Sequence, residues 1–458
     1  MPYSPELADI RFGCGLSPDI PGPTSVQAML DGLTGPDRMA QQFPISGFDT
    51  LRARLKTKAD LRARGKKPSD KSATREKIKA LRRESAKEAS RNFLQSLLRW
   101  TQTDTGFHER LVGFWADHFT ARGKSPILKF ATAPYIEEAI RPNVSGSFGD
   151  LLIATTTHPL MLHFLDQNLS IGPNSTRATK AKRLKGLNEN LAREVMELHT
   201  LGVGGPYTQT DVRQLAELFT GLSYSRLMDF KYRPGYAEPG AETVLHKSYG
   251  GGPATLDPVL RALRDLATHP ATARYIAQKL AVHFVSDTPD PALVQHIEAR
   301  FNDTGGDLRA VCAALLEHPS SWDARLSNVK PPADFIASAC RALALGQKRI
   351  GGLEVKRVQR LLMGPLDLMG QPWLRPNGPD GWTEEDVEWI TPQGVSTRLR
   401  WALSAPQKLR RDLPDPRAFV TTTLGQFAPP AVQFAADSAE SRSDAIGLVL
   451  ASPAFQRR

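Results

Sequence analysis

Two glutamates and a histidine stand close together in residues 188–201, a stretch that reads NENLAREVMELHTL. Carboxylates at this spacing suit two kinds of chemistry. Hard divalent cations prefer oxygen ligands, and carboxyl groups also exchange protons in general acid–base catalysis. Glu194 and Glu197 are therefore candidates both for catalysis and for metal binding, and His199 is the third candidate for the catalytic set.

The helix that carries these residues does not place all three on one face. On a continuous α-helix, Glu194 and Glu197 lie within about 60° of each other, whereas His199 projects about 160–200° away. His199 joins the glutamates only if the helix ends near Leu198, and three glycines at 202, 204 and 205 supply stop signals just beyond. The spacing is not the HExxH of zinc metalloproteases, so a site of that type is excluded.

An ordinary helix surface is the alternative explanation for the same residues. Arg193 stands four residues before Glu197 and four residues after Glu189, which is the spacing of surface ion pairs. In that case the glutamates form an ion-pair lattice and hold no ligand. The sequence leaves both explanations open.

A metal site would need ligands that the fold brings from other parts of the chain. His118 in the stretch FWADHF is one candidate, and His163 with Asp166, three residues apart on one helix face, supplies two more. The alternative for His118, which has aromatic neighbours, is a hydrogen-bonded core histidine. The predicted ligand set for a divalent metal of open identity is His118, His163, Asp166, Glu194 and Glu197.

Residues 364–395 are dense in proline, glycine and tryptophan, and they predict a long ordered loop of the kind that is more often functional than idle. Trp382 in this loop would cover the site, and Trp382 and Tyr207 are the candidate cofactor-binding residues. A redox cofactor formed from tryptophan, tyrosine and histidine side chains at a metal site is a further option.

The elements that position these residues are predicted to be helices. Thr208 and Asp211 have capping-box spacing before an apolar stripe, and His158, His269 and His318 each precede a proline, where we expect them to cap helix ends. One short strand is expected near 242–246. The predicted fold is mainly α, a multi-helix globular fold with few short strands and the long loop near the C-terminal part. Three regions are expected, 1–100, 101–345 and 346–458.

The formal net charge of +11 comes from one segment. Residues 51–91 hold sixteen Lys/Arg and five Asp/Glu, and the rest of the chain has equal numbers of each sign. The second half of this segment has the pattern of an amphipathic helix with a basic face. It is either a solvated surface helix or an arm that contacts an acidic partner or polyanion. No aromatic residue lies within 51–91, so base stacking gains no support.

Other classes of protein lose support from what the sequence lacks. No apolar run is long enough to span a bilayer, and no secretory signal precedes the first motifs, so a cytoplasmic location is expected. Cys14, Cys312 and Cys340 lie far apart and form no CxxC. The P-loop, the GxSxG elbow and a GxGxxG that follows a strand are also absent.

Several stretches resemble, in the same order, the bacterial family catalogued as domain of unknown function 1800. They are FWADHF, FGDLLIATTTHPLMLHFLDQNLSIGPNS, NENLAREVMELHTLGVGGPYTQTDV, AELFTGL, VKPPADFIASACRAL and MGQPWLRPNGPDGW, which together reach from about residue 105 to 405. The resemblance implies a mainly helical fold and no settled activity. It also implies a sulfatase-like companion protein, whose twin-arginine signal would allow shared export.

The chain departs from that family at three positions. Ala116 stands where relatives commonly have a second histidine, Ala237 replaces a histidine in a HEPG-like stretch, and His246 takes a position that is usually glycine. If those histidines are ligands in relatives, this chain has a reduced or rearranged site.

Two functions follow from these observations. The first is an enzyme with a carboxylate and histidine site on the 188–201 helix, either a metal-dependent hydrolase or an oxidoreductase. The second is a non-catalytic binding or assembly protein that uses residues 51–91 to contact an acidic partner.

Overall fold

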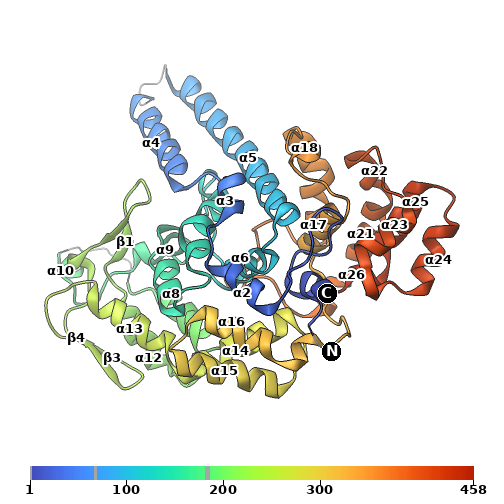
Figure 1. Ribbon diagram of the computed structural model, residues 1–458. Helices are drawn as coiled ribbons and strands as arrows, with labels where there is room; N and C mark the ends of the chain where they lie inside the picture. The colour runs from blue at the N-terminus through green and yellow to red at the C-terminus, as the bar shows by residue number, and fades with distance from the viewer. Residues whose placement is uncertain (1–2, 66–69, 181–185) are drawn as a thin grey trace.

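The computed structural model describes residues 3–65, 70–180 and 186–458. Within these ranges the chain is mainly helical, with two antiparallel two-stranded sheets (Figure 1). Strand β1 (Leu222–Tyr224) pairs with β2 (Phe230–Tyr232), and β3 (Ala241–Val244) pairs with β4 (Lys247–Gly250). The mainly α fold is confirmed, and the strand expected near 242–246 is β3. The β1–β2 hairpin was not predicted.

Helix starts follow the side chains that cap them. Helix α12 (Gln209–Leu218) opens with the predicted capping box of Thr208 and Asp211. At His158, where a helix end was expected, α8 (Phe148–Thr156) is separated from α9 (Pro159–Phe164).

The three histidines that precede prolines cap the following helix rather than the preceding one. The Nδ1 atoms of His158, His269 and His318 accept backbone N–H groups two residues ahead, at 3.1, 3.1 and 3.3 Å. The reason is that a residue before proline is held in an extended conformation, which turns its ring toward the free N–H groups of the next helix.

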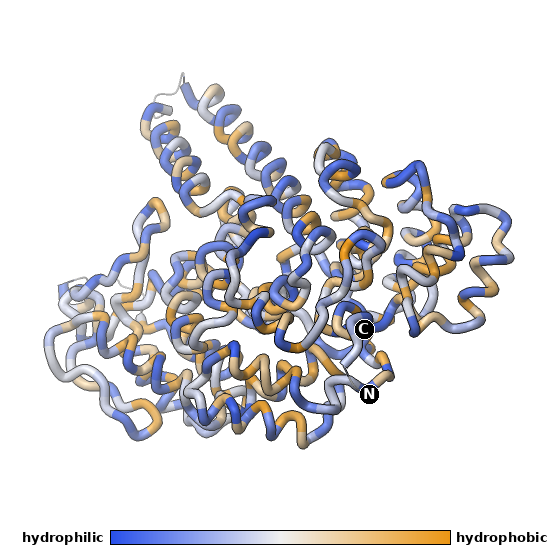
Figure 2. The backbone as a smooth tube through the Cα atoms, in the orientation of Figure 1, coloured by the Kyte–Doolittle hydropathy of each residue, from blue (hydrophilic) through white to orange (hydrophobic). Residues whose placement is uncertain are grey.

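The basic segment forms a helical hairpin that projects from the body of the protein (Figure 1). Its arms are α4 (Phe48–Arg64) and α5 (Lys71–Gln102), which contact each other. The sequence around residues 64–73, RGKKPSDKSA, predicts a break between the arms, and residues 66–69 of it lie outside the described residues. Ile78 and Leu81 are half-buried, whereas most of the basic residues around them are exposed. Figure 2 shows the matching alternation of hydrophilic and hydrophobic residues along both arms.

The hydrophobic core has two clusters. The first is built mainly from α2 (Val26–Thr34), α6 (Gly106–His118), α8, α9, α12, α13 (Asp257–Ala267), α14 (Pro270–Phe284), α15 (Pro291–Thr304) and α16 (Leu308–Glu317). The second is built from the end of α5 and from α17 (Pro332–Ala342), α21 (Pro392–Ser404), α23 (Pro416–Leu424), α25 (Arg442–Ala451) and their neighbours. The division into regions 1–100, 101–345 and 346–458 stays a prediction.

The 188–201 helix is irregular. Helix α11 (Asn190–Glu194) widens into the π-helical turn η7 (Val195–Thr200). The Leu201 N–H donates to the Met196 carbonyl, five residues back, at 2.9 Å. The helix is therefore neither a continuous α-helix nor ended at Leu198, because one extra residue fits into its last turn.

Only part of the predicted loop 364–395 is irregular, because helices occupy both of its ends. Its first residues form α20 (Gly364–Leu368), residues 386–389 form the short helix η11 (Asp386–Trp389), and α21 begins at Pro392. Residues 369–385 run irregularly between them. Among the described residues, no helix combines the length and the apolar composition that a membrane span requires.

Candidate functional site

The glutamate helix is tied together by one arginine. Arg193 donates to Glu189 at 3.2 Å and to Glu197 at 3.3 Å, and Gln209 donates to Glu189 at 2.8 Å. Glu194 is half-buried, and burial, followed by the charge of Glu197, raises its pKa. Glu189 and Glu197 thus have the surface ion-pair geometry that the alternative explanation predicted.

His199 does not face the glutamates. It is 1% exposed and lies against His118, whose Nε2 is 3.2 Å from the His199 carbonyl oxygen. The His118 Nδ1 and both ring nitrogens of His199 have no hydrogen-bond partner among the described residues. Burial lowers the pKa of His199 to about 3 and that of His118 well below its usual value. The two rings form a neutral buried pair.

His163 and Asp166 belong to a third place in the molecule. His163 Nδ1 is 2.9 Å from the Tyr224 hydroxyl and its Nε2 accepts the Lys124 N–H at 3.2 Å, while the Lys124 ammonium donates to Asp166 at 2.7 Å. The predicted metal ligands therefore lie in separate sets. No group of three or more His, Cys, Asp or Glu side chains in the described residues is arranged to hold a metal ion.

The two candidate cofactor-binding residues also differ in place. Tyr207 lies beside Glu197, whose negative charge and hydrogen bond add to burial in raising the pKa of the phenol. Trp382 lines a cavity that Tyr207 does not reach, and its ring centroid lies 6.2 Å from that of Trp389.

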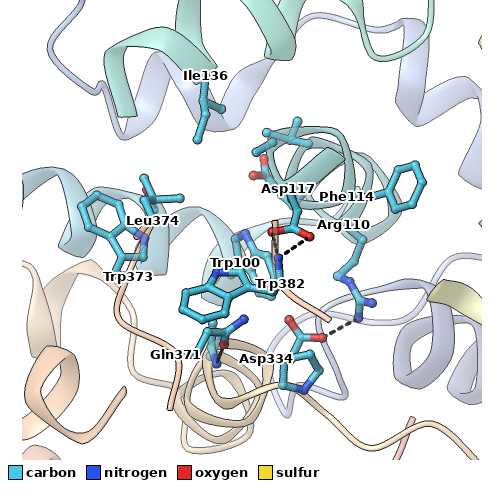
Figure 3. A pocket seen from close by; sticks show the side chains of 18 of the residues that line it. Trp100, Arg110, Phe114, Asp117, Ile136, Asp334, Gln371, Trp373, Leu374 and Trp382 are labelled. Atoms are coloured by element: carbon cyan, nitrogen blue, oxygen red, sulfur yellow. Dashed lines mark hydrogen bonds and ion pairs between the residues drawn. The ribbon is translucent and has the colours of Figure 1, made fainter. Parts of the chain in front are cut away.

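That cavity has a volume of about 220 Å³ and lies where the two hydrophobic clusters meet. Its walls come from the end of α5, from α6 and α17, and from the irregular residues that follow α20. Figure 3 shows the indoles of Trp100 and Trp373 with Leu374 toward one end, and Asp117, Arg110 and Asp334 toward the other. The cavity is therefore apolar at one end and charged at the other.

Asp117 stands at the charged end, on the last turn of α6. Its carboxylate oxygens accept the backbone N–H of Trp382 at 2.9 and 3.1 Å (Figure 3). Burial, followed by the negative charge of Glu384, raises the pKa of Asp117 to about 8. At neutral pH this carboxyl group carries a proton that it can donate.

Glu384 is the second carboxyl group on the cavity wall. The His283 Nδ1 lies 2.8 and 2.9 Å from its two oxygens. The His283 Nε2 is 3.2 Å from Arg110 Nη2, and because a guanidinium only donates, Nε2 must accept and the ring hydrogen is on Nδ1. His283 therefore donates to Glu384. Burial raises the pKa of Glu384 to about 7.

The hydrogen-bonded chain continues behind His283. Asp334 forms an ion pair with Arg110 at 3.2 Å and accepts a hydrogen bond from Arg458, and Arg458 Nη2 donates to the His283 carbonyl at 3.3 Å. The chain fixes both the orientation and the tautomer of His283, and through it the position of the Glu384 carboxylate.

A separate group of ion pairs also contributes to the cavity lining. Arg99 donates two hydrogen bonds, of 2.7 and 2.9 Å, to the Glu137 carboxylate. Arg141 bonds both Glu109 and Asp37, and the side chains of Arg141 and Glu109 are 5% and 2% exposed. Burial alone would raise the pKa of Glu109, but hydrogen bonds and charges from His108 and Arg141 lower it to about 2.

Comparison with protein families decides where the chain belongs. The family model described as "Protein of unknown function (DUF1800)" matches residues 11–457. The chain belongs to this family. No curated protein and no solved structure matches it.

Within this DUF1800 protein, the three unusual positions have different surroundings. Ala116 lines the cavity beside Asp117, so the position at which the family resemblance leads us to expect a histidine is a cavity position here. Ala237 is buried. His246 has a φ of +65° in the turn between β3 and β4, a conformation that favours glycine, which is the residue expected there.

Sequence reasoning missed Asp117, Glu384 and His283. Asp117 directly precedes His118, which drew attention because histidine is the commoner ligand. Glu384 lies in the predicted loop, two residues after Trp382. His283 sits near the end of an ordinary amphipathic helix, and nothing in its sequence surroundings marks it.

Proposed function

We propose that this protein is an enzyme that carries out general acid–base catalysis on a small, largely apolar organic molecule held in the cavity. The observation that carries this proposal is the pair of carboxyl groups, Asp117 and Glu384, on the wall of one cavity with aromatic walls. Two carboxyl groups with raised pKa values at one site are typical of proton-transfer chemistry near neutral pH.

Each carboxyl group has a role that follows from its surroundings. Asp117 is protonated at neutral pH and would act as the general acid. Glu384, with a pKa of about 7, is matched to work as the general base, and His283 holds its carboxylate in place. Closure by Trp382 and Trp389 would limit the access of water.

This version of the enzyme hypothesis has more support than the metal-dependent and redox versions. Asp117 and Glu384 share one cavity, whereas none of Glu194, Glu197 and His199 lines it, and the described residues hold no cluster of three or more possible metal ligands. The sulfatase-like companion, the export route and the cytoplasmic location stay predictions from the sequence.

The proposal is tested by nuclear magnetic resonance of metabolite mixtures in deuterated water. The wild-type protein should consume a compound, or exchange one of its hydrogens for deuterium, with a bell-shaped pH dependence. Glu384→Gln should slow that reaction about 10²–10⁴-fold, which is the usual contribution of a general base.

Glu197→Gln is the matched control, since it removes a carboxylate outside the cavity and should leave the rate unchanged. The proposal is contradicted if Glu384→Gln turns over every compound at the wild-type rate, or if Glu197→Gln abolishes turnover instead.

A second candidate function rests on the α4–α5 hairpin. It projects from the body (Figure 1) and carries the whole charge excess of the chain on largely exposed residues. The proposal is that the hairpin contacts an acidic partner or polyanion, since surface charge of one sign attracts the other over about a Debye length, roughly 8–10 Å in ordinary salt.

Charge reversal on the hairpin tests this candidate. The triple variant Lys77→Glu, Lys79→Glu, Arg83→Glu should elute from immobilised heparin at clearly lower salt than the wild type. The control reverses Lys348, Lys408 and Arg411, which lie outside the hairpin. Equal elution of the two triple variants would show that heparin senses net charge alone.

A further inference from the structure

At the charged end of the cavity, two buried arginines share one carboxylate. Arg110 and Arg458 line this end and their side chains are 4% and 3% exposed, yet both depend on one carboxylate, Asp334. Lys330 lies directly behind, 5% exposed, with its ammonium 4.0 Å from the centroid of the Phe455 ring. No carboxylate in the described residues lies within ion-pair distance of this ammonium.

The positive charges of these cations lower one another's pKa values. Burial, followed by the charges of Arg458, Arg110 and Arg398, lowers the pKa of Lys330 to about 7. Burial and Arg110 likewise lower the pKa of Arg458. The Nε of Arg458 has no hydrogen-bond partner among the described residues. A buried guanidinium N–H without an acceptor costs free energy, and a bound anion would remove that cost.

The number of charges indicates the charge of the ligand. Arg110 and Arg458 share the single carboxylate of Asp334, and no second carboxylate in the described residues lies within ion-pair distance of either guanidinium, so one positive charge is left without a counter-charge. A monoanion balances this excess, whereas a dianionic phosphate would reverse it. On Arg458, Nη1 bonds Asp334 and Nη2 bonds the His283 carbonyl, which leaves Nε to donate to an oxygen of a ligand carboxylate.

The opposite end of the cavity specifies the rest of the ligand. Trp100, Trp373 and Leu374 form an apolar end (Figure 3), and the Trp373 ring is held edge-on against Phe93 with centroids 5.4 Å apart. We infer that the cavity binds a small organic monocarboxylate, with its carboxylate on Arg110 and Arg458 and its aromatic or branched apolar body among the tryptophans. This inference deepens the proposed function and rests on it, since it names the substrate class of the same site.

The test compares benzoate with its neutral isostere benzamide, both titrated into the wild-type protein by calorimetry. Benzoate should bind about 10–100-fold more tightly, the range expected for hydrogen bonds between a buried charge and its counter-charge. Arg458→Gln should remove this preference and leave the affinity for benzamide unchanged. Equal affinities of the wild-type protein for the two compounds, or no binding of either below about 10 mM, would overturn the inference.

Arg398→Gln is the matched control. Arg398 is equally buried, with its Nε and Nη2 also unpartnered within the described chain, but it does not line the cavity. It should keep the preference for benzoate. If Arg458→Gln fails to fold, the comparison of benzoate with benzamide on the wild-type protein still decides the question.

The same titrations on Asp117→Asn and Glu384→Gln separate this inference from the proposed function. If these variants still prefer benzoate and their turnover is unaltered, the inferred anion site stands and the acid–base roles are refuted. If these variants lose turnover of a neutral substrate and the protein shows no preference for benzoate, the acid–base roles stand and the anion site is refuted.

Discussion

Replacing Asp117 by asparagine is expected to raise the free energy of unfolding by about 2–3 kcal/mol at pH 7 and to change it little at pH 4. In the unfolded chain an aspartate loses its proton near pH 4, whereas in the folded protein the pKa of Asp117 is about 8. Between these values the folded state binds more protons than the unfolded state, so this group lowers stability as pH rises. Asparagine removes the cost and keeps an oxygen for the Trp382 N–H.

Urea unfolding of the variant and the wild type at pH 4, 5.5 and 7 measures this difference. The expected gain in the free energy of unfolding is smaller than full burial of the Asp117 carboxylate would give, because this side chain faces the cavity. Asp303→Asn, an exposed change on α15, is the control and should show no such trend. A stability difference for Asp117→Asn that is independent of pH, or that falls toward pH 7, would contradict the assignment.

The replacement Arg141→Met should lower the free energy of unfolding by about 3–5 kcal/mol at pH 7, the usual cost of leaving a buried charge without its partner. The Glu109 carboxylate, 2% exposed, would lose its main cation, and Asp37 would lose the same partner. The pKa of Glu109 is lowered to about 2, so its contribution to stability is present above about pH 4.5 and is lost as pH falls toward 2.

Chemical denaturation of Arg141→Met and of Arg349→Met checks this prediction. Arg349 pairs with Asp412 at the surface, where an ion pair contributes about 0–1 kcal/mol. Equal losses in the two variants would show that burial of the Arg141 group has no special weight. The loss in Arg141→Met should also shrink below pH 4, where Glu109 can take up a proton.

Local signals were sufficient for most of the fold. The capping box at Thr208, the proline after His158 and the apolar stripe of α5 predicted helices that the structure contains, because each depends on residues within one or two turns. The π-helical turn at Val195–Thr200 was not predicted. Its backbone N–H groups bond the carbonyl five residues back instead of four, and no side chain in the stretch indicates this change.

The candidate site was out of reach for a different reason. Asp117, His283 and Glu384 are separated by more than a hundred residues from one to the next, and only the packing of α6, α14 and the loop brings them together. The close spacing of two glutamates and a histidine led to the prediction of a site at Glu194, Glu197 and His199. The chemistry of these residues depends on which side chains face them. Arg193 pairs with Glu197, as the ion-pair alternative predicted from their spacing, whereas the contact of His118 with His199 joins residues 81 positions apart and could not be assigned from spacing.

The central claim, that the cavity holds a carboxyl group protonated at neutral pH, is tested most directly by titrating Asp117 itself. Carbon-13 nuclear magnetic resonance of protein labelled at the aspartate carboxyl carbons follows this group, assigned as the signal absent from Asp117→Asn. The account predicts a midpoint at about pH 8. A midpoint at the ordinary value of about 4 would contradict it, since Asp117 would then have no proton to donate at neutral pH.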